Sequence, residues 1–380
     1  MTMKTNWQTK KLSELIDEGF VQLTRGKVIS KKDIAAHPGT YPIYSSAKNN
    51  DGMFGRYGKF MFDEPLITWS VDGGGRLFYR PKHKFSVTNV GGVLRILKPA
   101  LLDYQYLFYV LSLKHSEIRF DWVKKAHPSI IRELYKGIPL PPLKRQKQIV
   151  KELEEVFEKV AKAKENVEKN LQNSKELFEA YARGAFINPG DWSIKSLGEV
   201  CNLYQGIAIN AKTRHALVEK SELPLLRIKD LKNNAVEQYI DPNNYPKNAL
   251  VIETDLIYTR TGQIGLVFTG KRGVLHNNSF KIEPNHTLSR EYLFHWLQNP
   301  TFKSKIISLA SRVAQPDITH TLFKQQLIAI PSLTEQKSIV KKLDVLSTET
   351  KKLEAIYKQK LTDLEELKKS ILKRAFSGDL

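Results

Sequence analysis

The chain has 380 residues and a formal net charge of +20 at pH 7, from 60 lysine or arginine and 40 aspartate or glutamate residues. Such an excess favours a polyanionic partner. Hydrophobic residues, at 41%, suffice for packed cores and exclude a largely disordered protein. No run approaches the ~20 apolar residues that span a bilayer, so we expect a cytoplasmic protein with no membrane partner. The single cysteine, Cys201, excludes an internal disulfide and a multi-cysteine zinc site.

Residues 1–137 are predicted to form a globular domain of strands and turns, closed by a helix near residues 101–119. The strands are expected at Gly26–Ile29, Tyr41–Tyr44, Leu66–Trp69 and Gly92–Leu97. The loops are rich in groups that can contact DNA, since arginine pairs with guanine, asparagine and glutamine pair with adenine, and lysine neutralises phosphates. The candidate DNA-binding residues here are Ser45, Ser46, Lys48, Asn49, Arg56 and Arg76.

Residues 138–187 are predicted to form a long helix. Its seam side chains recur at alternate steps of four and three residues, the spacing of a coiled coil. These positions are Ile149, Leu153, Val156, Val160, Ala163, Val167, Asn170, Ser174, Leu177 and Tyr181. A helix of about 40 residues would be about 60 Å long.

A second globular domain is predicted at residues 188–327, with a closing helix near 289–309. Its strands are expected at Leu225–Ile228, Leu256–Thr259 and Leu266–Phe268. The same chemistry of base edges and phosphates selects its candidate DNA-binding residues. They are Arg227, Lys229, Asp230, Arg260, Thr261, Gln263, Lys271, Arg272, Asn277 and Asn278. For every candidate in either domain, a solvated turn or a capping role is the alternative.

Residues 328–380 are predicted to form a second long helix, which begins after a capping box of Ser332 and Glu335. Its seam comprises Ile339, Leu343, Leu346, Thr350, Leu353, Tyr357, Lys360, Leu364, Leu367 and Ile371. An amphipathic helix of this length needs a partner, and the other long helix is the obvious one. Antiparallel packing about a pseudo-twofold would bring Lys360 near Glu158; the alternative is that each helix lies on its own domain.

The two halves of the chain are copies of one unit. Fifteen of the 49 positions in 138–186 are identical to those found 190 residues later, including Gln146-Lys147, repeated as Gln336-Lys337, and Ala185-Phe186, repeated as Ala375-Phe376. The fold class is therefore predicted to be α+β, with two repeated domains separated by two long antiparallel coiled-coil helices. The helices are nearly balanced in charge, so most of the positive charge belongs to the domains.

No catalytic motif survives inspection. The glycines at 73–75 are followed by no Gly-Lys-Ser/Thr, which excludes a phosphate-binding loop. Asp317 with Glu335 and Lys337 superficially resembles the acidic pair and lysine of a nuclease, but the repeat lacks the equivalent acid and Glu335 begins a helix. The histidines form no metal-spaced cluster. We therefore predict no catalytic residue, no metal site and no cofactor bound by this chain.

The sequence resembles the specificity subunit of type I restriction-modification systems over essentially its whole length. The resemblance lies in Ile138-Pro-Leu-Pro-Pro-Leu with Gln146-Lys-Gln-Ile-Val, in Ile330-Pro-Ser-Leu-Thr-Glu-Gln, and in the terminal Leu372-Lys-Arg-Ala-Phe-Ser-Gly-Asp-Leu. Two further stretches, Leu66–Gly75 and Leu256–Gly265, look like that family's recognition-domain hairpins. The resemblance makes 1–137 and 188–327 target-recognition domains, and 138–187 and 328–380 spacer helices.

The resemblance also implies a division of labour. Each recognition domain would read one half of a split, asymmetric site in double-stranded DNA, and the helices would set the spacer and dock two methyltransferase subunits. S-adenosylmethionine and ATP would then bind to partner subunits, which include restriction or translocase subunits.

Three alternatives stay open. A combined restriction-methylation enzyme with other partners is hardly separable by sequence. A free-standing DNA-binding regulator would not need two long apolar seams. A purely structural coiled-coil scaffold would leave the positive charge of the domains unexplained.

Overall fold

The computed structural model describes residues 7–46, 50–72, 74–118, 125–310 and 316–379. The chain folds into two compact units. Unit 1 comprises residues 1–168 and 359–380, and unit 2 comprises residues 169–358. Among the described residues, no helix is long and apolar enough to cross a membrane.

Two long helices, α5 (Leu143–Gly184) and α11 (Leu333–Ser377), each contribute residues to both units. The capping box predicted for α11 is confirmed, because the main-chain N–H of Ser332 donates to the Glu335 carboxylate at 3.0 Å and the N–H of Glu335 donates back to the Ser332 hydroxyl at 3.3 Å. The two predicted long helices are thus present, and within each unit the start of one packs with the end of the other.

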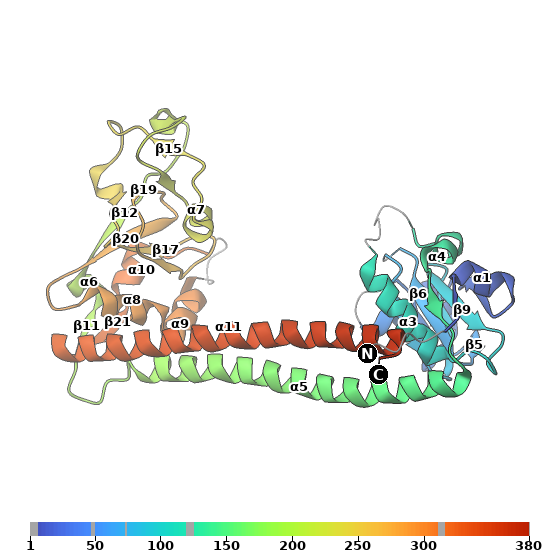
Figure 1. Cartoon of the computed structure of the whole chain (residues 1–380). Coiled ribbons are helices and arrows are strands. Elements are labelled where there is room, and N and C mark those ends of the chain that lie inside the picture. Colours follow the sequence, from blue (N-terminus) through green and yellow to red (C-terminus); the bar gives the residue numbers. More distant parts are fainter. Residues whose placement is uncertain (1–6, 47–49, 73, 119–124, 311–315, 380) are drawn as a thin grey trace. The chain divides into compact units, whose positions relative to one another are not determined.

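Unit 1 contains two four-stranded sheets. The first has the order β2-β9-β6-β7, built from Val21–Arg25, Gly91–Ile96, Leu66–Ser70 and Leu77–Arg80. The second has the order β4-β3-β8-β5, built from Met53–Tyr57, Tyr41–Tyr44, Lys84–Val87 and Phe62–Asp63. The other elements are β1 (Thr9–Lys10), α1 (Leu12–Asp17), α2 (Lys31–Ala36), a 3₁₀ turn (Asn50–Gly52), α3 (Tyr104–Glu117), α4 (Pro128–Leu134) and β10 (Ile138–Pro139). Figure 1 shows these elements in blue to teal.

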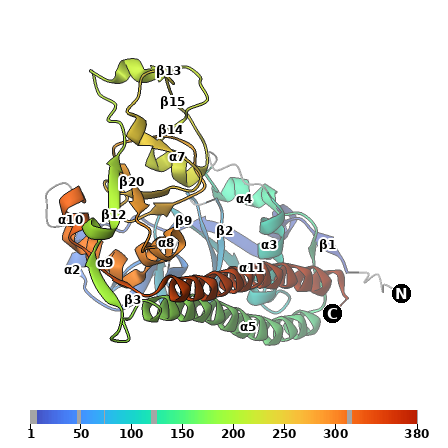
Figure 2. The same ribbon diagram turned by 90° about the vertical axis from the view of Figure 1, so that its left-hand side faces the viewer.

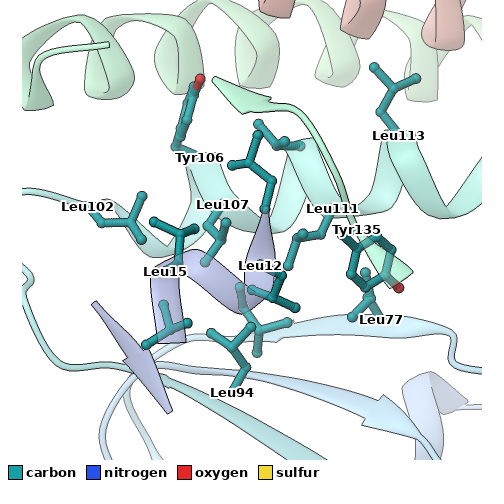
Figure 3. Close-up of a cluster of buried hydrophobic side chains, with 14 of the residues drawn as sticks. Leu12, Leu15, Leu77, Leu94, Leu102, Tyr106, Leu107, Leu111, Leu113 and Tyr135 are labelled. Carbon is teal, nitrogen blue, oxygen red and sulfur yellow. The ribbon is translucent and has the colours of Figure 1, made fainter. Parts of the chain in front are cut away.

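The main core of unit 1 lies between the first sheet and helix α3. Figure 3 shows Leu12 and Leu15 of α1, Leu94 of the sheet, and Leu107 and Leu111 of α3 meeting there. All five side chains are at most 1% exposed. Full burial of a leucine side chain contributes about 1.5–3 kcal/mol, so this cluster dominates the stability of the domain.

Unit 2 repeats the first sheet with the order β12-β20-β17-β18, built from Cys201–Gln205, Ser279–Pro284, Leu256–Thr259 and Val267–Phe268. A smaller sheet has the order β14-β19-β16, built from Leu225–Leu226, Gly273–Leu275 and Leu250–Val251. The remaining elements are β11 (Ser193–Ser196), α6 (Leu197–Val200), β13 (Leu217–Val218), α7 (Ile228–Asn233), β15 (Tyr239–Ile240), α8 (Arg290–Gln298), α9 (Pro300–Ala310), α10 (His320–Lys324), β21 (Leu327–Ile330) and two 3₁₀ turns (Arg214–Ala216 and Lys247–Ala249). Figures 1 and 2 agree that β13 and β15 lie on the side of this unit away from α11.

The predicted repeat is confirmed by a contact that both units share. Gln146 and Gln336 are fully buried at the starts of α5 and α11. The side-chain oxygen of Gln146 accepts from the main-chain N–H of Asp103 at 2.9 Å, and that of Gln336 accepts from the N–H of Ser289 at 2.8 Å. Asp103 and Ser289 are the N-caps of α3 and α8. The same glutamine therefore fixes each domain to the long helix that follows it.

Within unit 1 the two long helices run antiparallel. The Lys164 ammonium of α5 contacts the Glu365 carboxylate of α11 at 2.7 Å, and the Lys368 ammonium lies 4.9 Å from the centre of the Phe157 ring. Glu158 consequently faces the turn that contains Lys368. Lys360 lies about two helical turns away, so the predicted pairing of Lys360 with Glu158 is wrong.

The predicted seam is also wrong near its ends. Leu177 is 73% exposed and Leu367 is 46% exposed, whereas Ala182 is buried. A straight helix has 3.6 residues per turn, so its buried face drifts away from a strict seven-residue repeat. The buried stripe of α5 therefore continues through Phe178 and Ala182 instead of Leu177 and Tyr181.

The strand predicted at Gly26–Ile29 is absent, because β2 ends at Arg25. The backbone of Gly26 passes so close to the Val87 carbonyl oxygen that a Cβ would lie 2.1 Å from it. Only Lys27 then forms a bridge, with Thr88, before the chain leaves the sheet. The β-branched residues that suggested a strand are thus in a loop.

Several other predicted elements differ in their bounds, two of them because a helix begins nearby. The strand expected at Leu225–Ile228 stops at Leu226, because Arg227 is the N-cap of α7. The helix expected near 289–309 is two helices, α8 and α9, separated at Asn299. The Asn299 side chain accepts from the N–H of Thr301 at 2.8 Å and donates to the carbonyl of Ala182 at 2.7 Å, which joins the break to the end of α5.

Candidate nucleic-acid interface

Two of the candidate residues of unit 1, Ser45 and Ser46, lie at one edge of its two sheets, where β3 ends and the β6–β7 and β8–β9 turns meet. The Ser45 hydroxyl accepts from Thr88 at 2.9 Å, and the Ser46 hydroxyl donates to the carbonyl of Val90 at 2.5 Å. Each hydroxyl keeps hydrogen-bonding capacity: a donor on Ser45, and one acceptor lone pair on Ser46, whose oxygen also accepts from the main-chain N–H of Asp72 at 3.4 Å. The structure therefore leaves both half-buried serines able to contact a ligand.

The other candidates of unit 1 are more scattered. Arg76 is exposed in the β6–β7 turn, with its guanidinium 5.1 Å from the centre of the Phe78 ring. Arg56 lies farther along β4, opposite Pro42, and donates to the carbonyl of Thr40 at 2.8 Å. The structure does not bring Arg56 to the edge that holds the serines. Lys48 and Asn49 lie outside the described residues.

Arg80 is a polar residue of this edge that sequence reasoning missed. It is only 4% exposed at the end of β7. Burial lowers the pKa of its guanidinium to about 10, against an ordinary value of 12.5. Nothing in the sequence distinguishes this arginine from an exposed one, because its burial depends on Tyr44 and Phe78 folding over it.

The equivalent edge of unit 2 is formed by the β17–β18 and β19–β20 turns. The N–H groups of Arg260 and Thr261 both donate to the carbonyl of Asn278, at 2.8 and 3.3 Å. The N–H of Asn277 donates to the carbonyl of Ile207 at 2.9 Å. The fold thus gathers four of the predicted residues, Arg260, Thr261, Asn277 and Asn278, at one place. Gln263 is exposed at the tip of the β17–β18 turn, between Gly262 and Gly265, whose φ angles are +71° and +83°.

The side chain of Arg260 is engaged within the protein. It donates to the Asp317 carboxylate at 2.5 Å and to the carbonyl of Ile318 at 3.1 Å, and the side chain is 15% exposed. Asp317, half of the nuclease-like pair that we rejected from the sequence, is therefore the ion partner of an arginine. These bonds hold the β17–β18 turn against the segment before α10.

A second group of candidates surrounds the start of α7, beside this edge (Figure 1). The carboxylate of Asp230 accepts from the main-chain N–H of Arg227 at 3.1 Å and from its guanidinium at 2.6 and 2.9 Å. The Asp230 bond raises the pKa of Arg227. The Lys229 ammonium pairs with Glu237, which lowers the pKa of that carboxyl.

Proximity links α7 to the edge. A Cβ on Gly262 would lie 3.9 Å from the side chain of Ile228, and the N–H of His276 donates to the carbonyl of Leu226 at 3.1 Å. Burial, followed by the charge of Arg227, lowers the pKa of His276. His276 is thus a half-buried group of this surface whose lowered pKa favours the neutral imidazole, and no motif in the sequence singled it out. Lys271 bonds to Asn234 at 2.7 Å, and Arg272 is exposed.

Both units present the same topological edge with different side chains. In unit 1 the edge is formed by the turn between β6 and β7 and the turn before β9. In unit 2 it is formed by the equivalent turns, between β17 and β18 and before β20. Unit 1 presents two serines and the exposed Arg76, whereas unit 2 presents Gln263, two asparagines and a histidine beside an arginine that is bonded within the protein. Such an arrangement suits two readers of unlike sequences.

The family model for the type I restriction modification DNA specificity domain matches residues 4–172 and again residues 189–363. The chain belongs to this family. A type I specificity subunit of Mycoplasma pneumoniae is 27% identical over 348 residues, which cover 89% of each chain. The specificity subunit of the type I restriction enzyme MjaVIII of Methanocaldococcus jannaschii is 22% identical over 415 residues, covering 99% of this chain and 93% of that one.

Solved structures agree on the fold of this type I specificity subunit. A chain from a study of complex assembly and conformational transition in a type I restriction-modification system superposes with a TM-score of 0.77, at 18% identity and over 99% of both chains. One family match falls within each of the two repeats found from the sequence. Within the described residues, no group of three or more histidine, cysteine or acidic side chains is placed to hold a metal ion.

Proposed function

We propose that this specificity subunit reads a bipartite, asymmetric site in double-stranded DNA, one half with each unit. The observation that carries the proposal is the repeated edge, which has one topology and two sets of side chains. Serine hydroxyls can contact any base, whereas arginine favours guanine and asparagine favours adenine. The net charge of +20 supports binding to the phosphate backbone through a term that weakens with salt.

The test exchanges one reader at a time. The domain at residues 1–137 is replaced by that of a related subunit, and the chimera is co-expressed with its methyltransferase. Sequencing of methylated bases in the cells is expected to show a changed first half-site and an unchanged second one. A motif that changes in both halves, or in neither, would contradict the assignment of one half-site to each unit.

We infer that the two long helices set the spacer between the half-sites and dock two methyltransferase subunits, as the family resemblance implies. Removing seven residues from each helix, about 10 Å, keeps the buried stripes in phase and shortens both helices equally. The tolerated spacer is then expected to change while both half-sites stay the same. An unchanged spacer would remove the measuring role.

We further propose that this chain contributes recognition and no catalytic group. S-adenosylmethionine would bind to the methyltransferase subunits, and ATP to restriction or translocase subunits. The buried thiol of Cys201, whose pKa is raised to about 12 by burial, is poorly suited to act as a nucleophile, which supports this division. Calorimetry of the purified subunit is expected to detect neither ligand. The complex would act in the cytoplasm, where it reaches DNA.

A further inference from the structure

Arg80 makes an unusual set of contacts for a nearly buried cation. Its guanidinium carbon lies 3.6 Å from the centre of the Tyr44 ring and 4.7 Å from that of Phe78. Its Nε donates to the Thr68 hydroxyl at 3.1 Å, and its Nη2 donates to the carbonyl of Asp51 at 2.5 Å. Among the described residues, no carboxylate oxygen lies within 4.0 Å of it. The charge is therefore offset by aromatic faces, by neutral oxygens and, over a longer distance, by the Asp51 carboxylate, which acts to raise the pKa of Arg80 against the effect of burial.

These contacts join both ends of the segment that carries Ser45 and Ser46. Tyr44 is the last residue of β3, immediately before Ser45. At the other end, Asp51 has a φ of +50° and Gly52 a φ of +80°, a left-handed pair that turns the Asp51 carbonyl towards Arg80. The N–H of Ser45 donates to the carbonyl of Gly52 at 2.8 Å, which closes the segment.

Burial of a cation without an ion partner costs stability, so its retention needs compensation. Part comes from the two aromatic faces, which attract the guanidinium. The rest is hydrogen bonding to two groups whose positions matter for the edge, Thr68 of β6 and the Asp51 carbonyl. An aliphatic side chain would fill the space between Tyr44 and Phe78 but would hold neither group.

We propose that Arg80 is a specificity-determining positioning residue, which sets where Ser45 and Ser46 stand for reading the first half-site. This inference rests on the proposed function of unit 1. Arg80 acts through Tyr44, which directly precedes Ser45, and through the Asp51 carbonyl, and it does not itself touch a base. Discrimination between bases in one half-site, and not overall binding, is the property that depends on it.

The test uses the full chain with its methyltransferase, and compares Arg80→Met, Arg80→Lys and a control, Arg95→Met. Arg95 lies near the end of β9 that is farther from Ser45 and Ser46, and it forms a partly exposed ion pair with Glu64 at 2.6 Å. Its replacement therefore also removes an arginine contact from the same domain. The readout is the rate of methylation on the cognate site divided by that on sites with one changed base, for each half-site separately.

Arg80→Met is expected to reduce this ratio roughly tenfold in the first half-site and to leave the second unchanged. A tenfold loss is about the effect of one mismatched base pair. Arg80→Lys should restore part of the ratio, since an ammonium can still lie over Tyr44 and reach the Asp51 carbonyl. Arg95→Met should preserve it. An equal loss in both half-sites, or an unchanged ratio in folded Arg80→Met, would overturn the proposal. If Arg80→Met does not fold, the decision rests on Arg80→Lys. A wild-type ratio in Arg80→Lys, with a wild-type ratio in Arg95→Met, would then overturn the proposal, because a single ammonium does not replace the two separate nitrogens that bond to Thr68 and to the Asp51 carbonyl.

Failure of the proposed function would look different. In that case the exchange of residues 1–137 would leave the first half-site unchanged in the chimera. A successful exchange combined with an unaffected Arg80→Met would reject only the role of Arg80.

Discussion

The ring of Phe376 packs edge-on against Tyr106, with ring centroids 5.5 Å apart, and the Tyr106 hydroxyl donates to the carbonyl of Pro139 at 3.0 Å. Unit 2 has the same arrangement, in which Phe186 lies 5.2 Å from Tyr292 and that hydroxyl bonds to Ala329 at 2.9 Å. The domain of each unit is thus completed by a phenylalanine at the end of the long helix that begins in the other unit, in the last turn of α11 for Phe376 and two residues after α5 for Phe186.

Phe376→Ala should therefore destabilise unit 1. Phe376 is half-buried, so we expect a loss of about 1–2 kcal/mol, below the full cost of removing a core phenylalanine. Hydrogen exchange should show faster exchange in α3 and little change in α8, with the reverse for Phe186→Ala. Leu367→Ala, at an exposed position of the same helix, is the control. Equal effects of Phe376→Ala on both helices would refute the local role of the contact.

Gln336→Leu should cost about 2 kcal/mol, because it leaves the N–H of Ser289 and the carbonyls of Thr287 and Pro331 without their buried partner. Urea unfolding measures the change. Gln148→Leu removes an exposed glutamine whose amide bonds only to Glu152, and it should cost less than about 0.5 kcal/mol. Similar losses in the two variants would show that the buried bonds contribute little.

Arg260→Ala and Arg76→Ala should separate stability from binding. Loss of the Asp317 and Ile318 bonds is expected to cost unit 2 about 1–2 kcal/mol in unfolding free energy. Arg76 is exposed, so its removal should change stability by less than about 1 kcal/mol and weaken DNA binding by the complex. Thermal unfolding and DNA titration at two salt concentrations give both quantities. Unaltered stability in Arg260→Ala would indicate that its contact with Asp317 is dispensable.

Acid should remove the contribution of the Ser332–Glu335 capping box. Hydrogen bonds from the Ser332 hydroxyl and main chain lower the pKa of Glu335 below its ordinary 4.5. A carboxyl whose pKa is lower in the folded than in the unfolded protein stabilises the folded state at pH values above its unfolded-state pKa. This stabilisation is lost as the pH falls through the folded-state pKa. The stability difference between wild type and Glu335→Gln should therefore shrink from pH 7 towards pH 3. A difference that stays constant over this range would contradict the role of the ionised carboxylate.

The sequence predicted the long helices and the repeat because both depend on local spacing and on identity between copies. The role of Gln146 could not be predicted in this way, since its partners at Leu101 and Asp103 are defined only by the tertiary fold. Short apolar strands were easier to predict, and Leu256–Thr259, whose four residues are all buried, has the predicted bounds. Gly26–Ile29 was wrong because a close backbone approach, invisible in the sequence, takes the chain out of the sheet.

The candidate site shows a similar limit. The sequence does not distinguish an arginine whose side chain is exposed, such as Arg76, from one whose side chain is bonded to a buried or half-buried aspartate, such as Arg260. Burial of Arg80 depends on two aromatic rings that come from different strands. Composition could therefore identify loops that are rich in polar residues. The fold was needed to tell residues that position the edge, such as Arg80, from residues that are exposed on it.

The placement of residues 359–377 in unit 1 has a consequence for synthesis. Domains generally fold as they leave the ribosome, N-terminal first. Leu372 and Ala375 are buried in the same core as Leu12 and Ile149, so that core lacks part of its cover until the last helix has been translated. The domain that emerges first is therefore the one finished last, and a nascent chain arrested before residue 370 would expose apolar surface on its oldest part.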